Sequence, residues 1–471
     1  MTRRSVSHAD HQVAKGRRRR AAFVVAVFAI ALMVFSGEAH AAVSGDLVYS
    51  TRIGTGITPA AAYALAAGPE GVTAIVGERY VPNWGFSVPI VTKYNADGGR
   101  LWLQSCTDLG VGAAIAVAID AYGSVYAAGS VNDLDNTGGY DLALMKYGPA
   151  GTLKWARLYD GPASQSEHVE ALLIDKAGNI IVVGQSYNAV GDWGVVVMKY
   201  ARDGTSLWVE PARYDPGLTD PSAGDVEIHG AARDASGNIY VAGESEYWDG
   251  AEWVSSALML KFAASDGSRL WGKMYESATG RESSFSEVAV RDSLVVGVGY
   301  TWPEPEDALV VRYNTSGVLK HSREWGVGDA YGERYGDVAI DGSYNIYVTG
   351  GQWGNWEKAV TMKLRPDLTT AWKATFLPTS SMAEGRYIAR NSLGNVYVAG
   401  ARWTSTGLMD FLTLKYSSSG VRQWARVWSA GGAGDDTAHG LVLGTSGGAH
   451  VVGKVTNVGG FSQAVLLKYK L

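Results

Sequence analysis

The sequence has 471 residues, of which 60 are glycine and 16 are tryptophan, while only 18% carry a charged side chain. This balance favours many short strands separated by tight turns and argues against a mostly helical protein. The formal net charge of −5 provides no excess of basic residues, so we expect no nucleic acid partner.

The first 41 residues have the composition of a signal peptide. A basic block at residues 17–20 precedes an apolar stretch at 21–35 and a small-residue cleavage site at 39–41. The apolar stretch is shorter than the roughly 20 residues of a spanning helix, although an uncleaved anchor is an alternative. We therefore expect an exported protein (periplasmic, cell-surface or secreted) with no membrane span after cleavage and a single mature domain, 42–471.

The mature chain contains one repeat of about 53 residues, present eight times. Each copy predicts four strands, a to d. A small, apolar strand a leads through an Asp-x-x-Gly-Asn turn into an alternating strand b that ends at a glycine, as at residues 171–184. Strand c ends in Lys-Tyr or a close variant, and strand d follows a glycine turn and carries a tryptophan. The strand-d tryptophans are Trp102, Trp155, Trp208, Trp271, Trp372 and Trp424.

The order of the strands indicates a closed ring. Strand d follows strand c only seven times, because the chain stops at Leu471, and its eighth copy is found at residues 47–53. An N-terminal strand that completes the last repeat closes a ring and removes the exposed sheet edges. The sequence therefore predicts an all-β, closed β-propeller of eight four-stranded blades, with seven blades as the alternative.

These strand and turn motifs also resemble a known repeat. The strand Gly-Asn-Ile-Tyr-Val-Ala-Gly at 237–243, the Lys-Tyr strand ends and the Gly-x-x-x-Trp turns are similar to the seven-bladed β-propeller (SBBP) repeat of bacterial exported proteins. The resemblance covers about residues 45–471 and departs from the family in copy number. It implies an architecture rather than a defined activity, and no catalytic residues carry over from it.

One face of the ring is the better candidate for binding. In a four-stranded meander the a–b and c–d turns share one face, and in this chain they are short. The b–c and d–a loops share the other face, which we call the loop face, and they are longer and more variable. Variable loops on a rigid scaffold are where binding residues concentrate.

Every repeat has an aromatic residue between strands b and c. These rings either pack between loops and anchor them, or form an exposed set that stacks on sugars or grips peptide side chains. The candidate ligand-binding residues are Trp84, Tyr140, Trp193, Trp248, Trp253, Trp302, Trp353, Trp356 and Trp403, with Phe461 in the last repeat.

Ionisable residues recur near the start of strand a, where a radial arrangement would gather them at the channel mouth. They are Glu170, His229, Glu287, Arg386 and His439. Acids and histidines together can bind a metal or transfer protons, but none of these has a ligand spacing such as His-x-x-x-His. We therefore expect no metal site, no cofactor and no catalytic residue.

Two further patterns fall short of a site. The segment with Asp133, Asp135, Asn136 and Asp141 has the composition of a calcium loop but not the EF-hand order of ligands. Eight-bladed quinone-dependent dehydrogenases have tryptophan turns like the one at 203–208. They commonly carry a pair of adjacent cysteines over the cofactor, whereas Cys106 is the only cysteine in this chain.

The leading hypothesis is a binding module that recognises a protein or glycan of the cell envelope or extracellular space through its loop face. The alternatives are a structural scaffold in envelope assembly and, less favoured, a quinone- or metal-dependent enzyme.

Overall fold

The computed structural model describes residues 47–54, 58–132, 139–220, 222–277, 280–302, 305–326, 332–354, 357–379, 381–432, 434–445 and 447–471. All of them belong to one compact unit that runs from Glu38 to Leu471. The expected signal peptide, residues 133–138 and Trp356 lie outside the described residues. Within the described part of the chain, no helix is long and apolar enough to cross a membrane.

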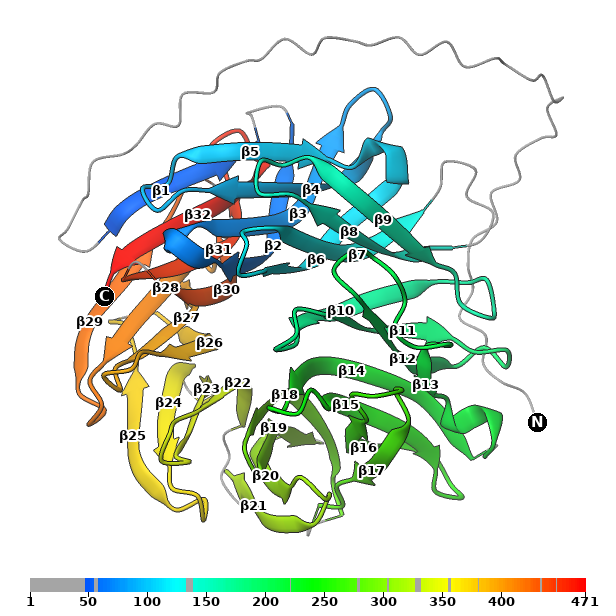
Figure 1. The fold of residues 1–471 in the computed structure, drawn as a ribbon. Coiled ribbons are helices and arrows are strands. Elements are labelled where there is room, and N and C mark those ends of the chain that lie inside the picture. Colours follow the sequence, from blue (N-terminus) through cyan, green and yellow to red (C-terminus); the bar gives the residue numbers. More distant parts are fainter. Residues whose placement is uncertain are drawn as a thin grey trace, which may run out of the picture. The chain divides into compact units, whose positions relative to one another are not determined.

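The fold is an eight-bladed β-propeller, as predicted: eight antiparallel four-stranded sheets are arranged in a ring (Figure 1). Each blade runs from an inner strand a to an outer strand d. Blades 1 to 4 are β2 (Ala60–Ala67), β3 (Thr73–Val81), β4 (Phe86–Tyr94), β5 (Arg100–Ser105); β6 (Val111–Ile119), β7 (Val125–Asn132), β8 (Asp141–Tyr147), β9 (Leu153–Tyr159); β10 (Glu167–Ile174), β11 (Ile180–Tyr187), β12 (Trp193–Tyr200), β13 (Ala212–Tyr214); and β14 (Ala223–Arg233), β15 (Ile239–Trp248), β16 (Trp253–Phe262), β17 (Arg269–Met274). Blades 5 to 8 are β18 (Glu282–Arg291), β19 (Leu294–Trp302), β20 (Asp307–Asn314), β21 (Leu319–Trp325); β22 (Glu333–Ile340), β23 (Ile346–Gln352), β24 (Lys358–Leu364), β25 (Thr370–Phe376); β26 (Ala383–Arg390), β27 (Val396–Trp403), β28 (Met409–Tyr416), β29 (Arg422–Trp428); and β30 (Thr437–Gly444), β31 (Gly448–Thr456), β32 (Ser462–Lys470), β1 (Leu47–Ile53). Short 3₁₀ turns, η1 (Pro69–Gly71), η2 (Thr107–Leu109) and η3 (Pro216–Leu218), are the only helices in the described ranges.

The N-terminal strand closes the ring as expected. β1 pairs antiparallel with β32, with Tyr49 opposite Lys468 and Ile53 opposite Ala464, and Figure 1 shows the two strands side by side. β2 of blade 1 then packs on β30–β32 of blade 8. The last blade is therefore built from both ends of the propeller sequence.

The core lies between blades rather than inside any one of them. Eight clusters of buried apolar side chains each combine residues of two neighbouring blades. Strands b and c are covered on both faces, so their sequences are nearly continuous apolar runs, as in the fully buried residues Ile180 to Val183 of β11. A strand needs alternation only where one of its faces meets water.

The glycine that was expected to end strand b lies instead in the middle of that strand. Gly184 pairs with Val169, and the register then shifts so that Glu170 is an extra residue in strand a, a β-bulge. A Cβ on Gly184 would lie only 2.3 Å from the carbonyl oxygen of His168. The recurrent glycine therefore marks a bulge in the inner strand, and strand b continues beyond it towards the loop face.

On the tight-turn face, hydrogen bonds link most pairs of neighbouring blades. Lys146 Nζ and Trp155 Nε1 of blade 2 both donate to the carbonyl of Arg202 in blade 3, at 2.7 and 3.1 Å. Lys468 closes the same series, because its Nζ donates to the carbonyl of Ala96 in blade 1 at 2.7 Å. The repeated Lys-Tyr and Trp residues thus hold the ring together.

Blade 3 departs from this plan. Its strand d, β13, has only three residues, and Trp208 lies in the bend before β13 rather than on the strand where it was expected. The ring of Trp208 is still buried and lies against Gly267 of blade 4. The inter-blade contact therefore remains, while the outer edge of blade 3 is shortened.

Candidate functional site

The b–c and d–a loops meet on one face, as the meander order predicts. The backbone N–H of Trp248, at the end of β15, donates to the carbonyl of Ser222, just before β14, at 2.6 Å. Trp353 donates in the same way to Gly332 at 2.7 Å. These bonds attach the ends of the b–c hairpins to the chain that enters each inner strand.

The aromatic residues of this face differ in exposure. Trp193, Trp302, Trp353 and Trp403 are half-buried. The ring of Trp193 lies 3.9 Å from that of Tyr187, and the guanidinium of Arg334 lies 4.7 Å from the ring of Trp353. Of the predicted aromatics, the exposed ones are Trp84, Tyr140, Trp248, Trp253 and Phe461. Their role in binding stays a prediction.

Blade 4 carries the most extended of these hairpins. β15 and β16 have ten residues each, and Trp248 pairs directly with Trp253 at the hairpin end. Their rings lie 5.9 Å apart in an edge-to-face arrangement, and the two side chains are 43% and 46% exposed. A Cβ on Gly224 would lie 2.8 Å from Cζ3 of Trp253, so this glycine allows the indole to lie against the backbone of β14.

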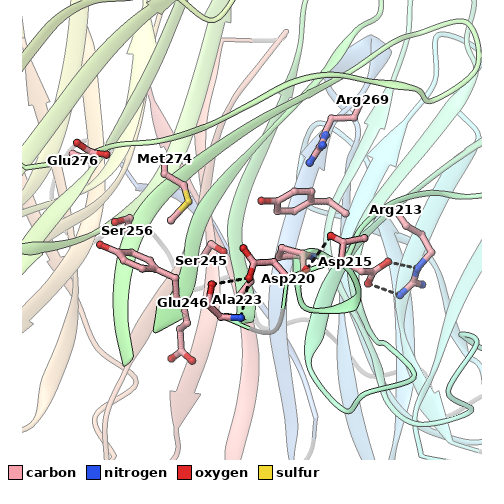
Figure 2. A pocket seen from close by; sticks show the side chains of 15 residues that line it. Arg213, Asp215, Asp220, Ala223, Ser245, Glu246, Ser256, Arg269, Met274 and Glu276 are labelled. Atoms are coloured by element: carbon pink, nitrogen blue, oxygen red, sulfur yellow. Dashed lines mark hydrogen bonds and ion pairs between the residues drawn. The ribbon is translucent and has the colours of Figure 1, made fainter. Parts of the chain in front are cut away.

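A cavity of about 760 Å³ lies between blades 3 and 4, beside this hairpin (Figure 2). One wall comes from β13 and the loop that contains η3, and the other comes from β15, β16 and β17 with the residues that follow β17. The short β13 leaves this space open against the outer strands of blade 4. The lining residues are Arg213, Tyr214, Asp215, Pro216, Thr219, Asp220, Ser222, Ala223, Ser245, Glu246, Tyr247, Ser256, Arg269, Met274 and Glu276.

The cavity wall contains both hydrogen-bond donors and acceptors. Arg213 binds Asp215 through two hydrogen bonds of 2.8 Å, drawn as dashed lines in Figure 2. The guanidinium of Arg269 lies 4.8 Å from the ring of Tyr214. Burial raises the pKa of Glu246 above its ordinary value, and neighbouring acids add to that shift. Such a wall suits a ligand rich in hydroxyl or amide groups.

Sequence reasoning found the two tryptophans at the end of this hairpin but missed the cavity. The available signal was the interval of 62 residues between Tyr200 and Phe262, against 51 to 53 elsewhere. The longer interval is assigned to an insertion around Tyr247 to Trp253, and an insertion does not show that the loops enclose a space.

The residues expected at the channel mouth lie at the inner-strand bulges. Glu170, His229, Arg386 and His439 are themselves the extra residues, and Glu287 directly follows the extra residue of β18. The bulge therefore explains why one polar residue recurs on an otherwise apolar strand.

Three of these residues interact with side chains of the adjacent blade. Burial raises the pKa of Glu170 to about 7, with a further contribution from Glu227. Burial and the nearby Asp337 raise the pKa of Glu287. His439 stacks on Tyr63, with ring centroids 5.9 Å apart, and its Nδ1 lies 2.7 Å from a backbone carbonyl.

One group near the axis has the composition of a metal site. Glu227 and His229 lie two residues apart on β14, and Glu244 is the partner of Glu227 on β15. Their ligand atoms lie within 4.8 Å of one another, and burial raises the pKa of Glu244 to about 7. Two of the three side chains are exposed, so the group could hold a divalent ion but is not built around one.

The architecture defines the protein class: an eight-bladed propeller closed by its N-terminal strand. No protein-family model and no curated protein matches the chain. Among solved structures it is similar to a Europium-containing methanol dehydrogenase, with 11% identity, a TM-score of 0.54 and coverage of 90% of this chain and 93% of that one. It is also similar to the β-propeller domain of the Trilobed protease from Pyrococcus furiosus (9% identity, TM-score 0.45, coverage 76% and 95%) and to the WD40 domain of SCAP from fission yeast (10%, 0.47, 87% and 95%). At these identities the similarity shows the fold alone.

Proposed function

We propose that the protein is an exported binding module of the SBBP repeat type that recognises a glycan through its loop face. Its primary site combines the cavity between blades 3 and 4 with Trp248 and Trp253 at the end of the β15–β16 hairpin, which forms part of the cavity wall. The observation that carries this proposal is the pair of exposed indoles on the extended hairpin beside a polar cavity.

The size and the lining of the cavity support this choice. About 760 Å³ lies within the roughly 300–1,000 Å³ of typical ligand sites. Sugars present apolar faces to aromatic rings and hydroxyl groups to carboxylates, amides and guanidinium groups. Asp220, Ser256 and Arg269 line the cavity and provide such polar partners.

The rigid placement of the two indoles supports it further. Trp253 begins β16, rests against Gly224 and touches its cross-strand partner Trp248. Little conformational entropy is then lost when a ligand stacks on the rings, which is how pre-organised aromatic residues increase affinity.

The test is a screen of glycans and cell-envelope proteins against residues 42–471, followed by titration calorimetry on the ligand found. Trp253→Ala and Trp248→Ala should each weaken binding about 30-fold, the effect of losing roughly 2 kcal/mol at an aromatic hot spot. Trp84→Ala is the matched control, because Trp84 is also exposed (37%) but lies on blade 1. It should change affinity less than about twofold.

Two outcomes would contradict the proposal. Equal affinities of the wild type and the Trp253→Ala variant would remove the site from blades 3 and 4. Binding only to an envelope protein, unaffected by any of the three variants, would favour the structural-scaffold alternative.

A further inference from the structure

A second group of side chains, on blades 2 and 3, has no part in the proposed glycan site. Asp141 begins β8, Asp160 directly follows β9, and Glu167 begins β10. One carboxylate oxygen from each lies within 4.8 Å of the other two. Three acids thus lie close together where the chain leaves blade 2 and enters blade 3.

Glu167 is the most constrained of the three. Its side chain is 0% exposed, and its Oε1 accepts a hydrogen bond of 3.0 Å from Ser186 Oγ. Its Oε2 is buried and has no hydrogen-bond partner among the described residues. A buried carboxylate with an unused oxygen is costly unless a cation faces it.

Blades 5 and 6 also have acids at two of these positions, but there the acids are paired with basic side chains. Asp307 begins β20 and Glu333 begins β22, as Asp141 and Glu167 begin β8 and β10. The backbone contact recurs as well: Glu333 N donates to Glu306 O at 2.7 Å, and Glu167 N donates to Tyr140 O at 2.6 Å. The two sites are therefore built on one scaffold.

In blades 5 and 6, basic side chains neutralise the two acids. Arg281 forms an ion pair with Asp307, and Lys373 Nζ lies 3.0 Å from Glu333 Oε1. The residue that follows strand d there is Gly326. The charges of the two acids at this site are thus balanced by two bases.

In blades 2 and 3 the equivalent positions differ in charge. The residue before strand a of blade 2 is Gly110, where blade 5 has Arg281. The residue after strand d is Asp160 in place of Gly326, so a third acid is added. No ion pair to Glu167 is found within the described ranges: Arg213, on strand d of blade 3, pairs with Asp215 and donates to Ser186.

We propose that Asp141, Asp160 and Glu167 bind a divalent cation of the calcium type between blades 2 and 3. The ligand set contains only carboxylate oxygens, which hard cations prefer, and it lacks the nitrogen and sulfur ligands typical of zinc. Calcium takes about 6–8 oxygen ligands in flexible geometry, so three carboxylates leave positions for water. A bound ion supplies the positive charge that Arg281 and Lys373 supply in blades 5 and 6.

The experiment uses the mature chain, residues 42–471, freed of metal with a chelator. Titration calorimetry with Ca²⁺ should show one site, with a dissociation constant of about 10⁻⁴–10⁻³ M or tighter. Terbium emission sensitised by Tyr140 and Tyr159, the neighbours of Asp141 and Asp160 in the sequence, provides a second readout. Saturating Ca²⁺ should raise the unfolding midpoint by about 3 °C.

Two variants remove the site and one serves as a control. Asp160→Asn, at an exposed position, should weaken Ca²⁺ binding at least tenfold without disturbing the fold. Glu167→Gln should abolish the Ca²⁺ shift and raise the midpoint of the metal-free protein, because it removes a buried charge. Glu333→Gln, at the equivalent position, should lower the midpoint and leave the Ca²⁺ response unchanged.

The proposal is overturned if the wild type shows no Ca²⁺ binding, or if Asp160→Asn and Glu167→Gln bind Ca²⁺ as tightly as the wild type. An equal response to Mg²⁺ at the same concentration would overturn the assignment to the calcium type.

Discussion

The contact between consecutive blades on the tight-turn face can be tested at Gly151. This residue lies in the c–d turn of blade 2 with a φ of +85°, and a Cβ there would lie 2.7 Å from Cγ of Trp102 in blade 1. Nε1 of the same indole donates to the carbonyl of Pro149 at 2.9 Å. Glycine is therefore favoured at position 151 for two reasons: the backbone is left-handed there, and the indole ring of Trp102 leaves no room for a Cβ.

An alanine at this position would lower the free energy of unfolding through each of these two effects separately. A left-handed backbone costs an alanine about 1 kcal/mol relative to glycine. Overpacking against a fixed ring adds about 2 kcal/mol. We expect Gly151→Ala to lower the free energy of unfolding by about 3 kcal/mol, the total of these two costs. Gly85→Ala is the control, because Gly85 has a φ of +74° with nothing within 4 Å of its Cβ position. It should cost only about 1 kcal/mol.

Urea unfolding followed by tryptophan emission and by circular dichroism measures both costs. Blade 6 supplies an internal precedent: Leu368 holds a φ of +64° in the equivalent turn, and the preceding blade has His321 where most of the other blades have tryptophan. Trp102→His should therefore recover about 1 kcal/mol of the loss in Gly151→Ala, measured as a double-mutant cycle. Equal costs for Gly151→Ala and Gly85→Ala would refute the role of the ring contact.

Three further results are expected. Burial and Asp337 raise the pKa of Glu287, so the folded state keeps a proton that the unfolded state releases above the ordinary pKa of 4.5. The free energy of unfolding should therefore fall as the pH rises from about 5 to about 8. Glu287→Gln should make this decline smaller, which unfolding midpoints measured at both pH values will show. Burial raises the pKa of the Cys106 thiol to about 11, so a thiol reagent at a pH of about 8 should react with it only as fast as the protein unfolds. Rapid labelling of the native protein would contradict the burial of this thiol. Lys468→Met should lower the free energy of unfolding by about 1 kcal/mol, because it leaves the carbonyl of Ala96 without its donor, and an unchanged urea midpoint would contradict its part in closing the ring.

The ring could be predicted from sequence because each repeated motif is determined by interactions among residues close together in the chain. In the turn before β15, the Asp234 carboxylate accepts from the backbone N–H groups of Ser236 and Asn238, both at 2.9 Å. Both bonds are made within the turn itself, so their signature is present in the sequence wherever the turn recurs. The pairing of β1 with β32 follows from the same logic, because a lone strand d at one end implies an incomplete blade at the other.

The parts that sequence reasoning missed depend on contacts between distant residues. The sequence pattern places Gly184 at the end of a strand, whereas the bulge depends on the partner strand, at Val169 and Glu170. Glu244 has no distinguishing local pattern, because its approach to Glu227 is set by cross-strand register. The exposure of each loop-face tryptophan likewise depends on neighbouring loops, so one pattern of residues produces both half-buried and exposed rings.

The two faces of the ring differ in what the blades require of them. On the tight-turn face, a donor such as Trp155 must meet a carbonyl of the next blade, so the residue types there are fixed by geometry. On the loop face, the start of strand a requires only a backbone bond, the one that Glu167 and Glu333 both make. Their side chains are therefore free to form an ion pair in one place and a carboxylate cluster in another. Differences between equivalent loop positions of a single chain are thus where its specific chemistry should be sought.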